Sequence, residues 1–86
     1  MGHSIKFKPS AERDLDSLPV EQRRRVFKAI RTLSNIPRPS GCKKLKGEDA
    51  YRIRVGEYRV IYEIHDNTLV VIVIKIGHRQ DVYRYF

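Results

Sequence analysis

Three arginines lie between Tyr51 and Tyr62, at positions 52, 54 and 59, an arrangement that could hold the phosphates of a nucleic acid. Gly56-Glu57 separates two runs with alternating apolar residues, which predicts a β-hairpin with a two-residue turn. Such a turn pairs Arg54 with Arg59, and Arg52 shares their face because side chains alternate along a strand. Directly opposed like charges destabilise a sheet, so the pattern indicates a surface that binds a polyanion.

A second group with chemical potential, His78, Arg79 and Tyr83, follows the hairpin, and Lys46 precedes it. Guanidinium groups bind phosphates through paired hydrogen bonds and can stabilise a pentacovalent phosphorane. His78 can transfer a proton near neutral pH, and Tyr83 can stack on a base or orient a phosphate. Together with the arginines, these residues suit RNA cleavage in which a 2′-hydroxyl attacks the adjacent phosphorus.

Composition favours one small domain, residues 1–86, with an anionic partner. The 86 residues include 18 Lys and Arg against 10 Asp and Glu, a net charge of +8, and nucleic acid is the leading candidate partner. The single cysteine, Cys42, excludes an intramolecular disulfide and favours a reducing compartment. We expect a cytoplasmic protein without membrane contact, because neither a signal peptide nor a membrane span is apparent. The three histidines lack metal-ligand spacing, so we expect no metal and no cofactor.

Hydrophobic periodicity indicates the elements that must position these groups. A strand near Ile5 precedes a helix that Ser10 caps, and a second helix runs from about Pro19 to Asn35. Three strands follow, at about 51–55, 58–64 and 69–76. The predicted fold class is α+β in the order β-α-α-β-β-β, an antiparallel sheet of about four strands packed on an N-terminal helical hairpin. The apolar stripe expected on the second helix consists of Val26, Phe27, Ile30 and Leu33.

The predicted register separates the two faces of the sheet. A turn at Asp66-Asn67 pairs Ile64 with Leu69 and places Arg59 opposite Ile74. One face should pack on the helices, and it carries Ile53, Val55, Val60, Tyr62, Ile64, Leu69, Val71 and Val73. The other face carries the three arginines with Ile61, Glu63, Ile72, Ile74, Ile76 and, by parity, His78. Lys75 falls on the helix side, which a bulge, an edge position or snorkelling would explain.

Further cations lie outside the hairpin. The second helix carries Arg23, Arg24, Lys28 and Arg31, and the connector before the hairpin carries Lys43, Lys44 and Lys46. Contact with RNA phosphates is one interpretation of these residues, and a solvated basic surface is the other.

The ordered set of motifs resembles the RelE family of bacterial and archaeal toxins, within the broader RelE/ParE superfamily. The residues that carry the resemblance are Leu45, Gly47, Tyr51-Arg52-Ile53-Arg54, Gly56, Tyr58-Arg59-Val60-Ile61-Tyr62, Gly77-His78-Arg79 and Asp81-Val82-Tyr83. The order of the elements also fits, and the resemblance covers nearly the whole chain.

This resemblance implies the toxin of a type II toxin–antitoxin pair. Such toxins enter the ribosomal A site and cut mRNA, leaving a 2′,3′-cyclic phosphate and a 5′-hydroxyl. The family's functional positions correspond to Arg52, Arg54, Arg59, Arg79 and Tyr83. The implied partners are the ribosome, mRNA and an antitoxin with an acidic, partly disordered binding segment. Operator DNA would be bound only through the antitoxin complex.

One departure from the family concerns the general base. Family members often carry lysines where this chain has Arg52 and Arg54, and arginine does not lose its proton in proteins. His78 is therefore the first candidate for the base, with Tyr83 or an acidic residue as the alternative. Two other functions remain open: a ParE-like toxin that poisons DNA gyrase without nuclease activity, and a non-catalytic module that binds RNA or the ribosome.

Overall fold

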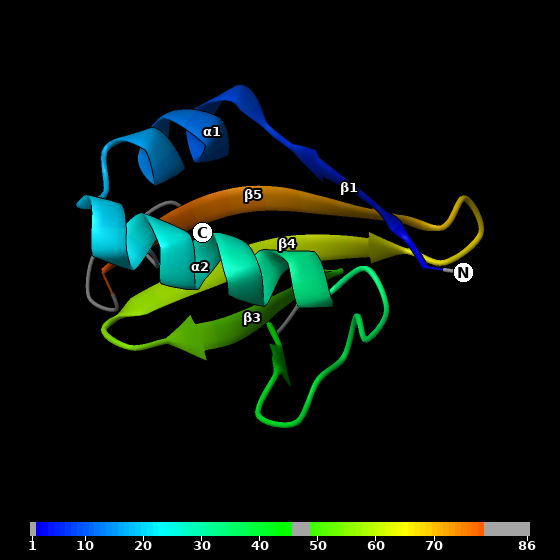
Figure 1. The fold of residues 1–86 in the computed structure, drawn as a ribbon. Helices are drawn as coiled ribbons and strands as arrows, with labels where there is room; N and C mark the ends of the chain where they lie inside the picture. Colours follow the sequence, from blue (N-terminus) through cyan, green and yellow to red (C-terminus); the bar gives the residue numbers. More distant parts are fainter. Residues whose placement is uncertain (1, 46–48, 79–86) are drawn as a thin grey trace.

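The computed structural model describes residues 2–45 and 49–78, in which two helices cover one face of a five-stranded sheet (Figure 1). This is the predicted α+β class with the predicted order of helices and long strands. The sheet order is β1-β5-β4-β3-β2. The elements are β1 (Ser4–Phe7), α1 (Pro9–Asp16), α2 (Val20–Thr32), β2 (Lys43–Lys44), β3 (Ala50–Val55), β4 (Tyr58–His65) and β5 (Val70–His78).

The sheet differs from the predicted one at both edges. A short strand of two lysines, β2, pairs antiparallel with Tyr51 and Arg52 of β3. At the other edge β1 runs parallel to β5, with Ile5 opposite Val71. The described sheet is therefore mixed, and the helical hairpin is the crossover that a parallel pair requires.

The helix boundaries follow proline more than the predicted caps. Helix α1 begins at Pro9, whose fixed φ suits the first turn, and Lys8 is its N-cap without a side-chain hydrogen bond. Ser10 is thus inside the helix and does not cap it. Helix α2 ends at Thr32, earlier than the predicted Asn35.

The main core lies between the helices and the sheet. Val26, Ile30 and Leu33 are fully buried, as the spacing predicts. Phe27 was predicted in the same stripe but is 43% exposed. It directly follows Val26 in the helix, so its side chain is turned away from the direction in which Val26 faces the core. The sheet contributes Tyr58, Val60, Tyr62, Val71, Val73 and Ile76 to this core.

Aromatic contacts fix the long connection after α2. The buried Tyr62 hydroxyl donates a hydrogen bond to the Pro37 carbonyl at 2.7 Å, and burial raises the pKa of this phenol. Arg38 stacks on Tyr51 at 5.1 Å and donates to Asp66 at 3.0 Å. These contacts hold the connection against the sheet, so that it returns to the edge where β2 forms.

The turn between β3 and β4 is as predicted, with Val55 opposite Tyr58. Gly56 has a φ of +60° and Glu57 has no positive φ, which is the pattern of a type II′ hairpin turn. The next turn differs, because Ile64 pairs with Val71. Leu69, predicted on the helix-facing side of a strand, lies in this turn with a φ of +54° and is 52% exposed.

A bulge interrupts the pairing of β4 with β5. Tyr62 pairs with Val73 and Ile61 with Lys75, so Ile74 is an additional residue in β5. Lys75 meets α1 there: its ammonium lies 3.1 Å from the Asp14 carboxylate, which also accepts the Ile76 N–H at 3.2 Å. The bulge reverses which face each later residue of β5 occupies.

Candidate functional site

Three arginines lie on the face of the sheet that points away from the helices. Arg54 is directly opposite Arg59, and Arg52 is opposite Ile61. Their neighbours Ile53 and Val60 belong to the core under the helices, so the arginines occupy the other face. The three arginines therefore share one face of the sheet, as the predicted hairpin register requires, and we call this face the arginine face.

The short strand β2 adds a fourth cation. Lys43 is directly opposite Arg52, which makes a second like-charge pair beside Arg54 and Arg59. Lys44 is opposite Tyr51 and therefore belongs to the other face, although the sequence placed the two lysines in one group. Lys46 lies outside the described residues.

The arginine face combines charge with apolar surface. Arg52 is 9% exposed and Arg59 is 7% exposed, whereas Arg54 is open to solvent. Ala50 and Ile61 form a small buried cluster on this side of the sheet, against which Leu45 and Ile74 pack. Arg52 Nε is buried and has no hydrogen-bond partner among the described residues. A buried donor without a partner costs about 1–3 kcal/mol, so an anionic ligand that reached it would gain affinity.

His78 does not share the arginine face. The prediction placed it there by alternation, but the bulge shifts the register, and His78 lies opposite Tyr58 on the helix side. The two rings are 4.7 Å apart at an angle of 39°. Ile76 shifts in the same way and is buried in the main core. The bulge also explains why Lys75 did not fit the predicted faces, since it lies opposite Ile61.

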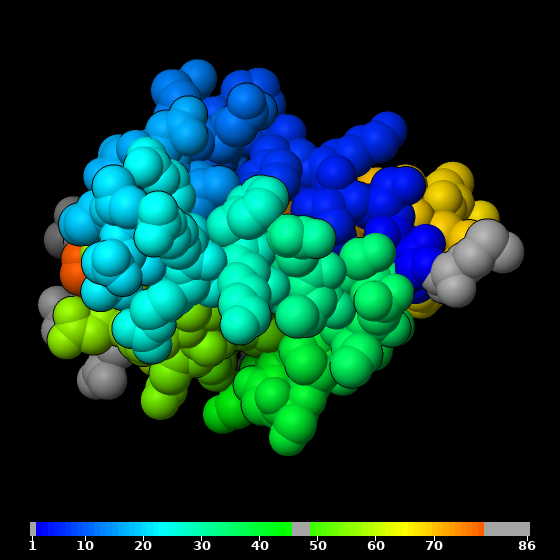
Figure 2. All heavy atoms as spheres, viewed as in Figure 1, coloured from blue at the N-terminus to red at the C-terminus, as the bar shows by residue number. Residues whose placement is uncertain are grey.

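The cations of α2 form a separate basic surface. Arg24, Lys28 and Arg31 are exposed, and Arg23 is half-buried and donates to the Asp16 carbonyl at 3.3 Å. Figure 2 shows this side of the molecule, where α2 crosses in front of the sheet. The helix layer separates these residues from the arginine face, so the sequence-predicted RNA-binding residues do not form one continuous patch.

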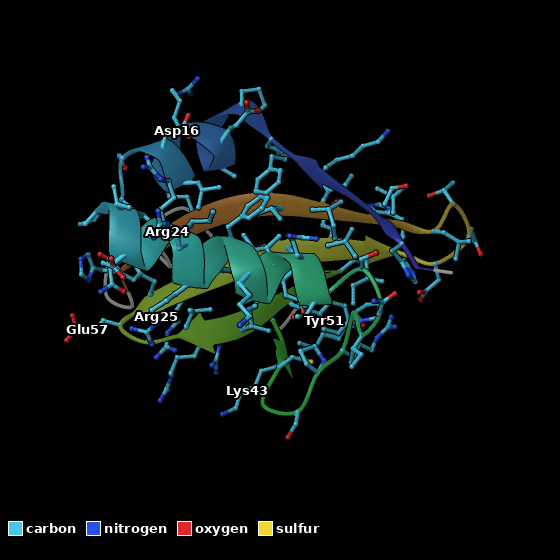
Figure 3. The ribbon with its side chains drawn as sticks, in the orientation of Figure 1. Asp16, Arg24, Arg25, Lys43, Tyr51 and Glu57 are labelled. Atoms are coloured by element: carbon cyan, nitrogen blue, oxygen red, sulfur yellow. The ribbon has the colours of Figure 1, made fainter. Side chains whose placement is uncertain are left out.

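Arg25 is a further positioned cation, which the sequence pattern did not single out as a site residue. Its side chain reaches from α2 toward the hairpin turn where Glu57 lies (Figure 3). A Cβ at Gly56 would lie 3.4 Å from Arg25 Nη2, so the guanidinium packs directly against this glycine. Arg25 precedes the buried Val26 in the sequence, but only the packing of α2 over the hairpin brings it to the turn.

The remaining predicted site residues, Arg79 and Tyr83, lie outside the described residues. Within the described part of the chain, no group of three His, Cys, Asp or Glu side chains could hold a metal ion. No described helix is long and apolar enough to cross a membrane.

The chain is similar throughout its length to known toxins. The family model for the ParE toxin of the parDE type II toxin–antitoxin system matches residues 5–83. Toxin RelG of Mycobacterium tuberculosis is 36% identical over 98% of this chain and 99% of its own length. The putative toxin RelE1 of Methanocaldococcus jannaschii is 34% identical over 84% of each chain.

Solved structures show the same fold. RelE in the RelE–RelB complex of Pyrococcus horikoshii superposes with a TM-score of 0.83 and 31% identity, covering 95% of this chain and 100% of that chain. A chain of the RelBE2 toxin–antitoxin complex of Mycobacterium tuberculosis gives a TM-score of 0.82 and 29% identity, covering 92% of this chain and 100% of its own.

Proposed function

The chain belongs to the RelE family of type II toxin–antitoxin toxins, and we propose that it is a ribosome-dependent endoribonuclease that cuts mRNA and so inhibits translation. The observation that carries this proposal is the direct opposition of Arg54 and Arg59, with Arg52 and Lys43 beside them on one face. Because like charges placed opposite each other destabilise a sheet, such an arrangement is best explained by an anionic ligand.

The arginine face suits phosphodiester cleavage by the RNA's own 2′-hydroxyl. The 2′-oxygen loses its proton and forms a bond to the adjacent phosphorus, while the bond from phosphorus to the 5′-oxygen breaks and that oxygen gains a proton. The products are a 2′,3′-cyclic phosphate and a 5′-hydroxyl. Fixed guanidinium groups stabilise the negative charge that develops on the phosphorane oxygens, and this stabilisation is usually the largest contribution to such catalysis.

His78 is not the proposed residue for proton transfer. His78 lies on the helix side of the sheet against Tyr58, so its ring is on the other face from the arginines. Arginine has no acceptor atom and cannot serve as a base, so Arg52 and Arg54 are proposed to act only through charge. Arg79 and Tyr83 complete the proposed set by their match to the family, and Tyr83 is then the candidate for the proton transfer.

We propose a RelB-like antitoxin as the protein partner, because related toxins occur in complexes with RelB. The net charge of +8 favours a segment rich in acidic residues. Operator DNA would be contacted through the antitoxin, and the toxin would act on ribosomes and mRNA in the cytoplasm.

The test is to incubate the purified protein with ribosomes programmed with a defined mRNA and to map the new 3′ ends by mass spectrometry. The proposal expects cleavage in the A-site codon, cyclic phosphate ends, and no cleavage of the same mRNA without ribosomes. Message that stays intact on the ribosomes would refute the nuclease assignment.

Poisoning of DNA gyrase is the second candidate function, since the matching family model is described as a ParE toxin. A supercoiling assay with purified gyrase separates the two functions. Loss of supercoiling together with intact mRNA would establish the ParE-like function instead.

A further inference from the structure

A cavity at the free part of the β3 edge is continuous with the arginine face. Its volume is about 490 Å³, within the range of about 300–1,000 Å³ that is typical of small-ligand sites. It lies where α2, the loop around Pro39 and Gly41, and β3 meet (Figure 2). Among the described strands β2 pairs only with Tyr51 and Arg52, so the wall at Ile53, Arg54 and Val55 is not covered by β2.

The lining of this cavity divides into a cationic and an apolar part. Lys43, Arg52 and Arg54 supply the charge, and Figure 3 shows the Lys43 side chain at the edge of the sheet below β3. Pro39 and Val55 supply flat or branched apolar surface. This combination matches a nucleotide, which joins an anionic phosphate to a base with two apolar faces.

Two features of the lining favour an anionic ligand in this cavity. Arg52 is more than nine-tenths buried, and its Nε has no hydrogen-bond partner among the described residues. The loop wall turns at Gly41, whose φ is +89°, and no described atom lies within 4 Å of the position a Cβ would take there. Gly41 therefore leaves open space on the loop wall of the cavity, and Arg52 lines the same cavity from β3.

We propose that this cavity binds one nucleotide of the RNA next to the phosphodiester held on the arginine face. This inference rests on the proposed function. Arg52 and Arg54 belong to both surfaces, so a strand lying on the arginine face would continue into the cavity with its next nucleotide. The phosphate contacts Lys43 and Arg52, and the base lies between Pro39 and Val55.

The test measures binding to the free protein, so it does not depend on cleavage. Uridine 3′-monophosphate is titrated into the ¹⁵N-labelled full chain, with uridine and inorganic phosphate as separate probes. The nucleotide should shift the amides of Ser40, Gly41 and Val55 and bind more tightly than either fragment. Equal binding of inorganic phosphate, or an absence of shifts at these amides, would overturn the proposal. Shifts of these amides caused by an acidic peptide but not by the nucleotide would assign the cavity to a protein partner and overturn the proposal.

Two variants test the geometry against matched controls. Ser40→Trp fills the cavity mouth without changing the charge, and Lys43→Ala removes one phosphate contact; each should weaken nucleotide binding about tenfold. Ser10→Trp and Lys6→Ala, both at exposed positions on other elements, should bind as the parent does. If Ser40→Trp shifts amides throughout the protein, it has changed the fold, and the test then rests on nucleotide binding by Lys43→Ala. Unchanged binding by Lys43→Ala would contradict the proposal.

The same variants separate this inference from the proposed function. If Ser40→Trp and Lys43→Ala both weaken nucleotide binding while mRNA stays intact on ribosomes, the cavity is established and the nuclease assignment is refuted. Cleavage of mRNA with no nucleotide binding in the cavity would refute the cavity proposal and support the nuclease assignment.

Discussion

Arg54 and Arg59 should destabilise the sheet, because their backbones pair directly across the β-hairpin and bring two like charges together. Arg54 is exposed, so a neutral residue could replace it without loss of core packing. A residue whose removal relieves repulsion but abolishes activity is retained for its ligand. This distinction can be measured, since stability and activity should change in opposite directions.

For Arg54→Ala we expect stability to stay constant or rise by about 0.2–1 kcal/mol, because one member of a repulsive cross-strand pair is removed. Arg54→Glu should stabilise more, since it creates an opposite-charge pair with Arg59. Urea denaturation monitored by circular dichroism gives both values. Destabilisation of both variants by more than this range would show that Arg54 has a structural role.

Asp66 is a surface carboxylate whose contacts with Arg38 and His3 should contribute to stability in a pH-dependent way. The Arg38 guanidinium, with His3 as a second partner, holds the pKa of this carboxyl below its ordinary value of 3.8. Its contribution to folding is therefore complete above pH 3.8 and is lost as pH falls through the lowered pKa, because the unfolded chain takes up the proton first. Melting temperatures of the parent and Asp66→Asn should differ by a constant amount at higher pH and converge as pH falls from about 4 to 2. A difference that stays constant over this range would contradict the assignment.

At the scale of elements, helix α1 contacts the last part of β5, beyond the point where the neighbouring strand β1 ends. β1 accompanies β5 only as far as Val73, and beyond it Asp14 of α1 accepts the Ile76 N–H and pairs with Lys75. The contact lies directly after the bulge, so Asp14 secures the register that carries His78 to the helix side.

Asp14→Ala should destabilise the fold by about 1–3 kcal/mol, because it leaves the N–H of the buried Ile76 without its acceptor. Asp14→Asn keeps an acceptor oxygen and should cost less. Urea denaturation gives the free energies, and hydrogen exchange at the Ile76 amide supplies a local readout. Equal stability of the alanine and asparagine variants would show that the charge on Asp14, and not the hydrogen bond, is what matters.

Local patterns predicted the hairpin, while long-range pairing decided the rest of the site. Gly56 and the alternating residues around it fix the β3–β4 register within twelve residues of sequence, so Arg54 and Arg59 could be paired from sequence alone. The bulge at Ile74 has no such signature, because the run from Leu69 to Ile74 is apolar at every position. Without alternation the faces of β5 cannot be assigned, and His78 was placed on the wrong one. A two-residue strand such as β2 likewise has too little length to show periodicity.

At the scale of the whole molecule, the positive charge is divided between two sides. The α2 surface with Arg24, Lys28 and Arg31 faces away from the sheet, while the arginine face lies beneath it. Under the proposed function, this division would serve two tasks: attraction to the ribosome as a large polyanion, and contact with one phosphodiester. Charge at a distance from the cut site should affect how tightly the protein binds and not how fast it cleaves once bound.

The double variant Arg24→Ala/Arg31→Ala should bind ribosomes more weakly and reduce the slope of log K against log salt by roughly 1 for each phosphate that is no longer neutralised. Cleavage at saturating protein should keep the parental rate. Binding measured by sedimentation at several salt concentrations tests this, with Lys6→Ala/Lys8→Ala as the charge-matched control. A parental salt slope would show that these arginines are simply solvated.

The most direct measurement of the central claim is the single-turnover rate of mRNA cleavage on programmed ribosomes, at saturating protein, for the parent, Arg54→Ala and Lys6→Ala. If the arginine face stabilises the cleavage transition state, Arg54→Ala should be slower by about 10²–10³-fold while remaining folded, and Lys6→Ala should match the parent. Equal rates for Arg54→Ala and the parent would contradict the account.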